Sequence, residues 1–349
     1  MDAGGELAAV MLLATFAGAT ISLLVCLYAN PLAIRLGLMD VPDGRRKVHA
    51  RATPLIGGLA VILPVLAFGL CQLPLGDNAA LSGGLVAAGA AFFVLGLWDD
   101  RRHIRPLVRL ASSLALFWAV VHAVPSLQVE FLSFSFLNQA VFLEGWSRFF
   151  TLLCLVGLIN AINMADGKNG LVMGMALIWT CLLLAHAPPE LWPLLGCLAA
   201  GLAVALAFNL QGALFLGDGG AYALAALLGL LSTHCYGVGF VELPADEIAL
   251  WFLIPVVDCL RLMASRLLRG HSPFTPDRNH LHHILFRRLS WRWGLVAYLS
   301  LVALPAIGAN LSPETLPLWA IVSLTAYALL LVGDARALAQ PLGVKRALG

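Results

Sequence analysis

Residues 192–237 read WPLLGCLAAGLAVALAFNLQGALFLGDGGAYALAALLGLLSTHCYG, and Asp218 is the only Asp, Glu, Lys or Arg among them. Two apolar runs, 192–210 and 221–237, flank the short segment that carries this carboxylate. A helix needs about 20 consecutive apolar residues to span the hydrocarbon core of a bilayer. The stretch therefore predicts two membrane-spanning helices joined by a short loop with one acid.

The composition of the whole chain extends this pattern. Of the 349 residues, 60% are hydrophobic and only 11% are charged, with a mean hydropathy of +0.90. Soluble domains carry about 25% charged residues, so most of this chain is expected to lie in lipid, and no nucleic-acid partner is indicated. The prediction is an all-α polytopic membrane protein with about 11 transmembrane helices. The apolar segments are 6–29, 56–75, 80–98, 107–124, 147–163, 170–187, 192–210, 221–237, 247–265, 293–310 and 317–333.

The distribution of Lys and Arg predicts how the chain is oriented, because cytoplasmic loops of membrane proteins are enriched in these residues. With the N-terminus outside and the C-terminus cytoplasmic, 20 of the 21 Lys and Arg fall on the inner side. We expect a single integral membrane domain over 1–349. Its motif-bearing cytoplasmic loops are 30–55, 99–106, 164–169, 211–220 and 266–292.

The acidic residues divide by type between the two predicted sides. All seven Glu fall on the outer side, whereas nine Asp fall on the inner side, which places the chemistry in the cytoplasm. On the outer side, residues 128–136 (QVEFLSFSF) alternate between polar and apolar. This alternation is typical of a strand and predicts a small periplasmic β-hairpin.

Two inner segments place carboxylates at the ends of predicted helices. Asp99 and Asp100 are adjacent in GLWDDRRHIRP, where they would hold a cation, activate or position an acceptor, or form a solvated pair neutralised by the neighbouring arginines. Asp218 lies in FLGDGGAY before an apolar run. It fits a metal carboxylate for a diphosphate, and the alternative is a helix N-cap.

A third inner segment, NAINMADGKNGL, carries Asn160, Asn163 and Asp166. The i, i+3 spacing places both Asn on one helical face, and Asp166 follows in the turn that ends the helix. Polar groups at membrane depth are costly unless they line a cavity or pair internally. The segment therefore predicts either a polar site or hydrogen bonding between helices.

The remaining polar loops carry positive and imidazole groups. In HSPFTPDRNHLHH, the side chains of Arg278, His280, His282 and His283 would bind phosphate oxygens or, for the histidines, zinc, unless the loop is merely solvated. The loop DVPDGRRKVHARATPLIGG contains Lys47 in a basic patch that suits an anionic lipid or a nucleotide phosphate. Asp258 lies three residues before Arg261, which predicts an ion pair within one helix.

In this order and spacing, the motifs resemble those of the polyprenyl-phosphate N-acetylhexosamine-1-phosphate transferases (glycosyltransferase family 4), over roughly residues 30–290. The matching segments are PLIGG at 54–58, Asp99-Asp100, Asn160-x-x-Asn163-x-x-Asp166-Gly167, Gly217-Asp218-x-Gly220 and Asp277-Arg278-x-His280-x-His282-His283. The stretch 272–280 is similar to the WecA-like branch. An MraY-like phospho-MurNAc-pentapeptide transferase is the alternative within the superfamily, and a cation-coupled membrane transporter is the alternative from another class.

The resemblance implies transfer of an N-acetylhexosamine-1-phosphate, expected to be GlcNAc-1-phosphate, from a UDP-sugar to undecaprenyl phosphate with release of UMP. It implies a bacterial inner membrane enzyme that starts a lipid-linked surface glycan such as O-antigen or capsule. Asp218 is the expected ligand of Mg²⁺, with Mn²⁺ as the alternative ion, and a homodimer is a further hypothesis. The implied catalytic residues are Asp99, Asp100 and Asp166, and the implied substrate-binding residues are Lys47, Asn160, Asn163, Asn169, Arg278, His280, His282 and His283.

The sequence departs from this family at one position of the Asp166 motif. Members of the WecA-like branch commonly read D-G-x-D-G, but Asn169 stands where the second Asp is found. The carboxylate contact that this Asp would make to the nucleotide or sugar is therefore absent. The identity of the donor sugar is the part of the predicted function that this change affects.

Overall fold

The computed structural model describes residues 3–41, 52–72, 79–239, 243–275 and 278–339. Within these residues the chain is almost entirely helical, and each of the eleven predicted apolar segments is a helix. The fold class, an all-α polytopic membrane protein, is therefore confirmed. The helices are α1 (Ala3–Leu27), α3 (Gly57–Gln72), α4 (Ala79–Arg102), α5 (Pro106–Ala123), α6 (Ser147–Ala165), α7 (Leu171–His186), α8 (Trp192–Leu210), α9 (Gly217–Val238), α10 (Ala245–Leu268), α12 (Trp291–Leu311) and α13 (Leu316–Ala339).

Nine of these helices, in the part of the chain that the structure describes, are long and apolar enough to cross a bilayer. The other two, α3 and α7, have 16 residues each. At 1.5 Å per residue such a helix measures about 24 Å, somewhat less than the roughly 30 Å hydrocarbon core. The eleven predicted segments thus divide into nine full-length spans and two shorter apolar helices.

Two short helices were not among the predicted elements. They are α2 (Ala29–Leu36) and α11 (Leu281–Arg288), with eight residues each. Each mixes apolar and charged side chains, so neither produces a long hydrophobic run. The sequence pattern that reveals a spanning helix is absent from both, because it depends on about 20 apolar residues in succession.

The small β-hairpin that the alternation in 128–136 predicts is present. Strand β3 (Phe131–Leu132) pairs antiparallel with β4 (Val141–Phe142). A second pair joins β1 (Met39–Asp40) to β2 (Thr53–Pro54). The described residues also contain four short 3-10 helices: η1 (Pro125–Leu127), η2 (Glu144–Trp146), η3 (Pro189–Leu191) and η4 (Pro313–Thr315).

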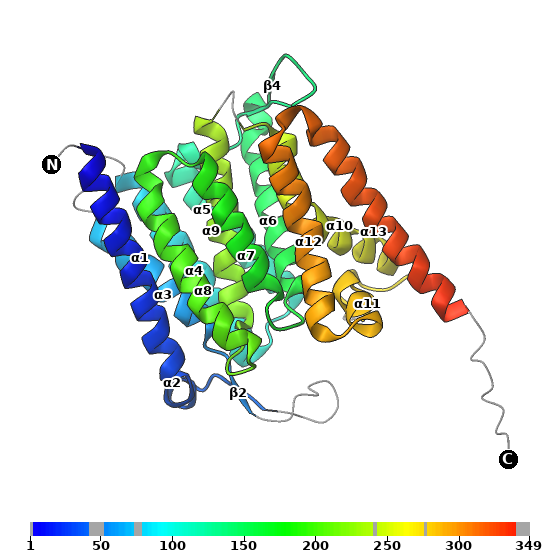
Figure 1. Cartoon of the computed structure of the whole chain (residues 1–349), viewed down its shortest axis with the longest axis horizontal. Coiled ribbons are helices and arrows are strands. Elements are labelled where there is room, and N and C mark those ends of the chain that lie inside the picture. The colour runs from blue at the N-terminus through cyan, green and yellow to red at the C-terminus, as the bar shows by residue number, and fades with distance from the viewer. Residues whose placement is uncertain (1–2, 42–51, 73–78, 240–242, 276–277, 340–349) are drawn as a thin grey trace.

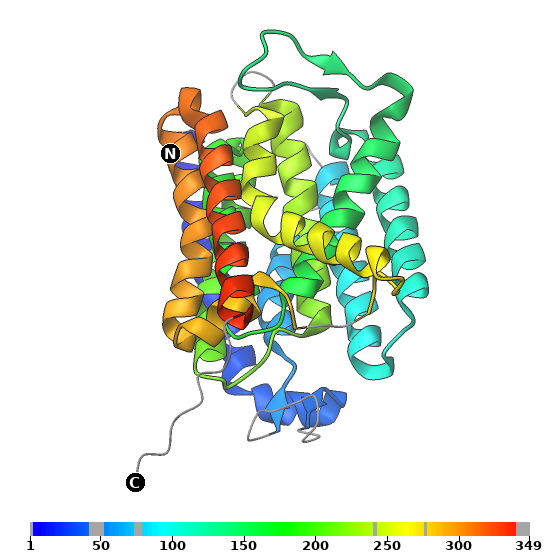
Figure 2. The same cartoon turned by 90° about the vertical axis from the view of Figure 1, so that its right-hand side faces the viewer.

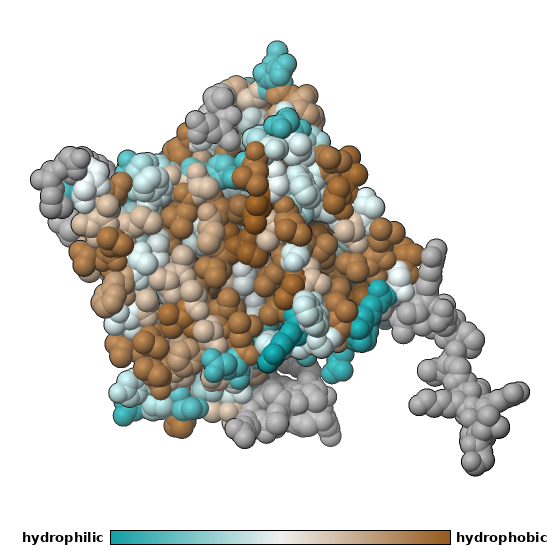
Figure 3. Space-filling model, in the orientation of Figure 1, coloured by the Kyte–Doolittle hydropathy of each residue, from teal (hydrophilic) through white to brown (hydrophobic). Residues whose placement is uncertain are grey.

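The long helices lie side by side, and the short elements gather at the two ends of the bundle. The β3–β4 hairpin lies at the upper end in Figures 1 and 2, whereas α2, β2 and α11 lie toward the lower end. On the face shown in Figure 3, hydrophobic residues predominate across the middle and hydrophilic residues concentrate near both ends. This distribution is the one expected of a protein that spans a bilayer.

Helix α9 is the centre of the bundle, since every residue in it except Asp218, Gly237 and Val238 is buried. It packs closely against α3 and α4 because glycines remove the side chains at the crossings. A Cβ atom on Gly58 would lie 2.5 Å from the Gly220 Cα, and one on Gly96 would lie 2.3 Å from the Asp218 carbonyl oxygen. These glycines allow helix backbones to approach each other directly.

The PLIGG segment holds the loop that precedes α9. The Phe215 amide donates to the Pro54 carbonyl at 2.8 Å, the Gly57 amide donates to the Phe215 carbonyl at 2.8 Å, and the Gly58 amide donates to the Leu216 carbonyl at 2.9 Å. Backbone groups at membrane depth need such internal partners. The segment thereby fixes the position from which α9 and its carboxylate begin.

A candidate phosphosugar transferase site

Asp99, at the end of α4, is held by three hydrogen bonds. Its Oδ2 accepts from Nη1 of Arg109 at 3.0 Å and from the hydroxyl of Tyr222 at 2.6 Å. Its Oδ1 accepts from the amide of Ile104 at 3.0 Å. Asp99 is buried, and both of its oxygens are occupied by groups from α5, α9 and the turn after α4. This carboxylate therefore ties three elements together, and it keeps Arg109 and Tyr222 in place.

Asp100 points instead to the start of α9. Its Oδ1 accepts from the Asp218 amide at 3.0 Å and its Oδ2 from the Gly219 amide at 3.1 Å. The first amides of a helix have no partner within the helix, so a carboxylate from another helix satisfies them well. Gly217 permits the turn, because its φ is +75° and a Cβ there would lie 2.9 Å from the Asp100 Oδ2.

Asp218 is joined to the end of α6 through Asn163. The Asn163 side-chain amide donates to the Asp218 Oδ1 at 2.9 Å. Asn160, one turn earlier, donates to the carbonyl of Val156 in its own helix at 2.7 Å. Of the two predicted asparagines, one thus contacts the α9 carboxylate directly. The other lines the small cleft beside it.

This cleft lies between α5, α6 and α9. Polar side chains from all three helices face it at the depth of the apolar spans, where they need either a partner or a ligand. Three of them, Arg109, Ser113 and Tyr222, were not identified from the sequence. The residues that line the cleft are Arg109, Leu110, Ser113, Ile159, Asn160, Asn163 and Tyr222.

Asp166 follows directly after α6 and completes a group of three acids with Asp100 and Asp218, which we term the carboxylate cluster. Burial, together with the nearby charges of Asp218 and Asp100, raises the pKa of Asp166 to about 8. Like charges held this close disfavour ionisation of one another unless a cation offsets them. The structure thus brings together three predicted acids that lie on three different helices or helix ends.

The carboxylate cluster offers hard oxygen donors, which suit Mg²⁺ in chemical type. Among the described residues, no group of three His, Cys, Asp or Glu side chains is arranged as a complete metal-binding set. Mg²⁺ usually takes only one or two protein carboxylates, and it fills its other positions with water and substrate phosphates. The residues therefore fit a magnesium ion that binds together with its substrate.

Asn209, near the end of α8, is a site residue that the sequence reasoning missed. Its Oδ1 accepts from the Gly170 amide at 2.6 Å, and its Nδ2 donates to the Leu214 carbonyl at 2.9 Å. It links the loop after Asp166 to the loop before Asp218. A buried amide in the last turn of an apolar run is the sequence signal that identifies it. Asn169 is half-buried in the same region, with its Nδ2 3.7 Å from a Cβ built on Gly212.

The three histidines of the segment 280–283 form one group of neighbouring rings. The rings of His280 and His282 are parallel within 13° at 5.4 Å, and those of His282 and His283 are 4.2 Å apart. His282 is buried, and a Cβ on Gly167 would lie 2.5 Å from its Nε2. The group thus packs against the turn that contains Asp166, with His282 as the contact.

The two histidines on α11 are held in the neutral form. Burial lowers the pKa of His282 well below its ordinary range, and the neighbouring His283 and His280 lower it further. Burial lowers the pKa of His283 to about 4, with His280, Lys168 and Arg278 acting in the same direction. Lys168 and Arg278 are both exposed, so the positive charges lie at the surface beside the histidines.

The structure therefore gathers most of the predicted site. Asp99, Asp100, Asn160, Asn163, Asp166 and Asp218 meet where α4, α6 and α9 come together, and the histidines lie beside the Asp166 turn. Lys47 of the basic loop, and Asp277 of the histidine motif, lie outside the described residues.

Comparison with known proteins agrees with this arrangement. The family model described as "Glycosyl transferase family 4" matches residues 82–236, which include Asp99, Asp100, Asp166 and Asp218. The undecaprenyl-phosphate alpha-N-acetylglucosaminyl 1-phosphate transferase of Yersinia pestis is 30% identical over 324 residues, covering 87% of this chain and 86% of that protein. The transferase of the same name from Salmonella typhi is 28% identical over 330 residues, covering 87% and 85%.

A third relative comes from another organism. The decaprenyl-phosphate N-acetylglucosaminephosphotransferase of Mycolicibacterium smegmatis is 30% identical over 290 residues, which cover 74% of this chain and 71% of that protein. The similarity extends along most of both chains in each case, as the motif order from residue 54 to residue 283 had indicated. The chain belongs to glycosyl transferase family 4, in the WecA-like branch of membrane-embedded phosphosugar transferases.

Proposed function

We propose that the chain transfers GlcNAc-1-phosphate from UDP-GlcNAc to undecaprenyl phosphate. A phosphate oxygen of the lipid attacks the phosphorus that carries the sugar, the bond from that phosphorus to the UMP oxygen breaks, and UMP leaves. The products are UMP and a lipid-linked diphosphosugar. The observation that carries the proposal is the carboxylate cluster, because it joins α4, α6 and α9 directly beside a polar cleft.

The carboxylate cluster is the proposed binding region for Mg²⁺. Asp218 and Asp166 are the proposed ligands, since Asp100 already accepts two backbone hydrogen bonds at the start of α9. A bound magnesium ion would supply neutralisation of the negative charge on the diphosphate, which is a main requirement of phosphoryl transfer. Asn163 keeps the Asp218 carboxylate oriented through its hydrogen bond.

The cleft between α5, α6 and α9 is the proposed place for the lipid phosphate. Arg109 and Asn160 offer hydrogen-bond donors in it, and Asp99 holds Arg109 in position. The phosphate group of the lipid is already ionised at neutral pH, so it needs orientation more than deprotonation. Asp99 is accordingly assigned as a positioning residue, and not as a general base.

The proposed donor side lies at the histidines. His280, with the exposed Arg278 and Lys168, offers positive or hydrogen-bonding groups for the phosphates of the nucleotide. His282 packs against the Asp166 turn at Gly167. Lys47 and Asn169 stay proposals for nucleotide or sugar contacts, and Asn169 cannot supply the carboxylate that relatives commonly have there.

The proposed location is a bacterial inner membrane, with the N-terminus outside and the site facing the cytoplasm. The Lys and Arg distribution supports this orientation, in which the site would face the cytoplasm. In this setting the product would begin a lipid-linked surface glycan.

The test is release of UMP by the purified protein in detergent. Reactions would contain undecaprenyl phosphate, Mg²⁺ and either UDP-GlcNAc, UDP-GalNAc or UDP-MurNAc-pentapeptide, with EDTA and lipid-free reactions as controls. Release from UDP-GlcNAc that needs both the lipid and the metal is the expected result. Release only from UDP-MurNAc-pentapeptide, or no release from any donor by folded protein, would contradict the proposal.

A further inference from the structure

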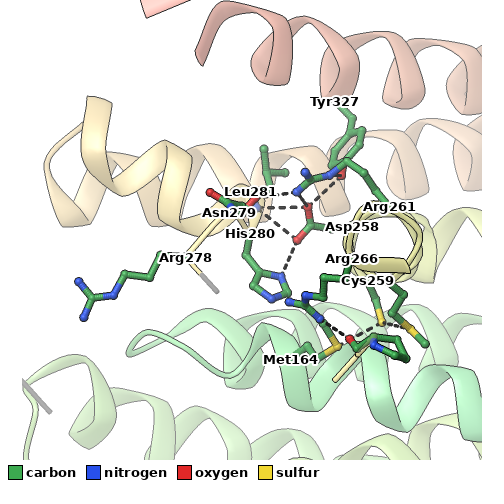
Figure 4. A network of polar contacts seen from close by, with 12 residues as sticks. Met164, Asp258, Cys259, Arg261, Arg266, Arg278, Asn279, His280, Leu281 and Tyr327 are labelled. Carbon is green, nitrogen blue, oxygen red and sulfur yellow. Dashed lines mark hydrogen bonds and ion pairs between the residues drawn. The ribbon is translucent and has the colours of Figure 1, made fainter. Parts of the chain in front are cut away.

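Asp258, buried in α10, is the centre of a polar network and has no role of its own in the proposed reaction (Figure 4). Its Oδ2 lies 2.9 Å from Nδ1 of His280. Its Oδ1 accepts from Nη2 of Arg261 and from the hydroxyl of Tyr327, both at 2.8 Å. The predicted ion pair with Arg261 is therefore present, but it is one part of a larger arrangement.

The donors around Asp258 fix the proton on His280. The amide of Leu281, at the start of α11, lies 3.2 Å from both carboxylate oxygens, so these oxygens face hydrogen-bond donors from Arg261, Tyr327 and Leu281. An ionised carboxylate can only accept hydrogen bonds. Nδ1 of His280 must then carry the hydrogen, which leaves Nε2 as the ring atom that can meet a substrate.

Tyr327 connects this arrangement to α13. Its hydroxyl donates to Asp258 and accepts from Nε of Arg261 at 2.7 Å. Arg261 also donates from Nη2 to the carbonyl of Asn279 at 2.7 Å, directly before His280. Helices α10, α11 and α13 and the histidine loop thus meet at one carboxylate, and each contact restricts how the His280 ring can turn.

His280 is connected to the turn of the carboxylate cluster through one intermediate ring, that of His282. His280 stacks in parallel on His282, and His282 abuts Gly167 in the turn after Asp166. A rotated His280 would disturb this stack. When the His280 ring keeps this orientation, its Nε2 edge stays in one place beside the turn that contains Asp166.

We propose that Asp258, supported by Tyr327, is a positioning residue that fixes the tautomer and orientation of His280, so that Nε2 is presented to a phosphate of the nucleotide sugar. This inference rests on the proposed function. Carboxylates that orient a metal-ligating histidine typically change metal affinity or activity by about 10- to 100-fold when they are removed, and we expect an effect of about this size for His280. The ligand class is the diphosphate group of the donor, whatever its sugar.

The kinetic test is a double-mutant cycle with Asp258→Asn, His280→Ala and the double variant. Asp258→Asn should lower kcat/KM for UDP-GlcNAc about 10- to 100-fold. If Asp258 acts through His280, the double variant should be no slower than His280→Ala alone. Losses that multiply in the double variant would show that Asp258 supports the fold generally, and would overturn the proposal.

Tyr327→Phe provides a second variant, because Asp258→Asn leaves the partly buried Arg261 without its charge partner and can prevent folding. Removal of the hydroxyl should lower kcat/KM several-fold in the native background and have no effect in the His280→Ala background. Asp246→Asn and Tyr236→Phe are matched controls, since both residues are hydrogen-bonded to the 131–135 segment of the hairpin region. Wild-type kinetics in Tyr327→Phe, or equal losses in the controls, would contradict the proposal.

A spectroscopic measurement separates this inference from the proposed function. In protein labelled with ¹⁵N-histidine, the His280 signals are those that disappear in His280→Ala. They should report a protonated Nδ1 in the native chain and a changed pattern in Asp258→Asn. A neutral ring protonated only at Nε2 would overturn the inference even if the enzyme is active. A wild-type chain that releases no UMP would overturn the proposed function, and the ¹⁵N pattern would still decide the arrangement of His280.

Discussion

The Asp100 carboxylate accepts a hydrogen bond from the backbone amide of Asp218 at 3.0 Å, although the two residues are 118 positions apart. Asp100 thereby holds α9, the helix that carries Asp218, and both acids belong to the carboxylate cluster. Movement of the α4 end would displace Asp218, because Asp100 also accepts from the next amide, that of Gly219. The position of the proposed metal ligand is thus set by another acid of the carboxylate cluster.

Asp218→Asn should lower turnover by about 10²-fold or more, because the variant keeps the shape of the side chain but loses the charge that attracts Mg²⁺. Its Nδ2 would also face the Asn163 amide, where the native carboxylate accepts a hydrogen bond. UMP release as a function of Mg²⁺ concentration is the measurement. Glu130→Gln, at an exposed position in the hairpin region, is the matched control and should behave as the native chain does. Native turnover in Asp218→Asn would remove the metal assignment.

Asp99→Asn should mainly destabilise the fold. The substitution leaves Arg109 without its ion pair, and it disturbs the hydrogen bond from Tyr222. Breaking a fully buried pair costs about 3–5 kcal/mol, and we expect roughly 2–3 kcal/mol here because Arg109 is partly exposed. Tyr222→Phe, which removes a single hydrogen bond to the same carboxylate, should cost about 1–2 kcal/mol. Thermal unfolding in detergent measures both, and an unchanged midpoint in Asp99→Asn would contradict the positioning role.

Gly58→Ala should be strongly destabilising. The new methyl group would lie 2.5 Å from the Cα and amide nitrogen of Gly220, and backbone atoms cannot move aside as a side chain can. Overpacking of this kind costs about 1–3 kcal/mol, and the α3–α9 contact would have to open. Gly157→Ala in α6 is the matched control, since nothing lies within 4 Å of a Cβ there. That variant should be neutral or slightly stabilised, because Ala favours helix more than Gly does. Equal midpoints in the two variants would show that the close crossing is unimportant.

The contribution of His283 to the stability of the chain should decrease as the pH falls from about 6.5 toward 4, whereas Asp166, whose pKa is raised to about 8, contributes in the opposite direction. His283 has a pKa of about 4 in the folded chain and an ordinary value of 6.5, so the unfolded chain binds more protons within this window. Proton uptake by the unfolded state then favours unfolding as the pH falls. His283→Gln should remove this destabilisation, so that its unfolding midpoint falls less, or rises more, than that of the native chain as the pH is lowered from 7 to 5. An identical slope in the variant would mean that His283 is accessible to protons in the folded chain.

The membrane helices could be predicted from the sequence because their signal is local. A run of about 20 apolar residues has few alternatives, and each of the eleven runs became a helix. The hairpin was predictable for a similar reason, since alternation in 128–136 is visible without knowledge of the partner strand. Helices α2 and α11 were not, because a helix of eight residues with charged side chains resembles an ordinary polar loop.

The residue types of the site were predictable from the sequence, but the separate structural roles of these residues were not. Asp99 and Asp100 are adjacent and chemically identical, and the sequence left open which of them serves the acceptor. The structure distinguishes them by their partners. Asp99 is bonded to Arg109 and Tyr222, whereas Asp100 is bonded to the start of α9. Asn209 and Arg109 were missed for the same reason, since their importance depends on loops and helices that only the folded chain brings together.

The burial of α9 also determines when during biosynthesis the site can exist. Helices α3, α4 and α6, which pack around α9, precede it in the chain, so the surface that receives Asp218 is synthesised first. His280 and its supports on α10, α11 and α13 are synthesised afterwards. A nascent chain that has just completed α9 therefore contains every acid of the carboxylate cluster and none of the histidine group. Competence for the reaction would be acquired only when the last helices have entered the membrane and docked.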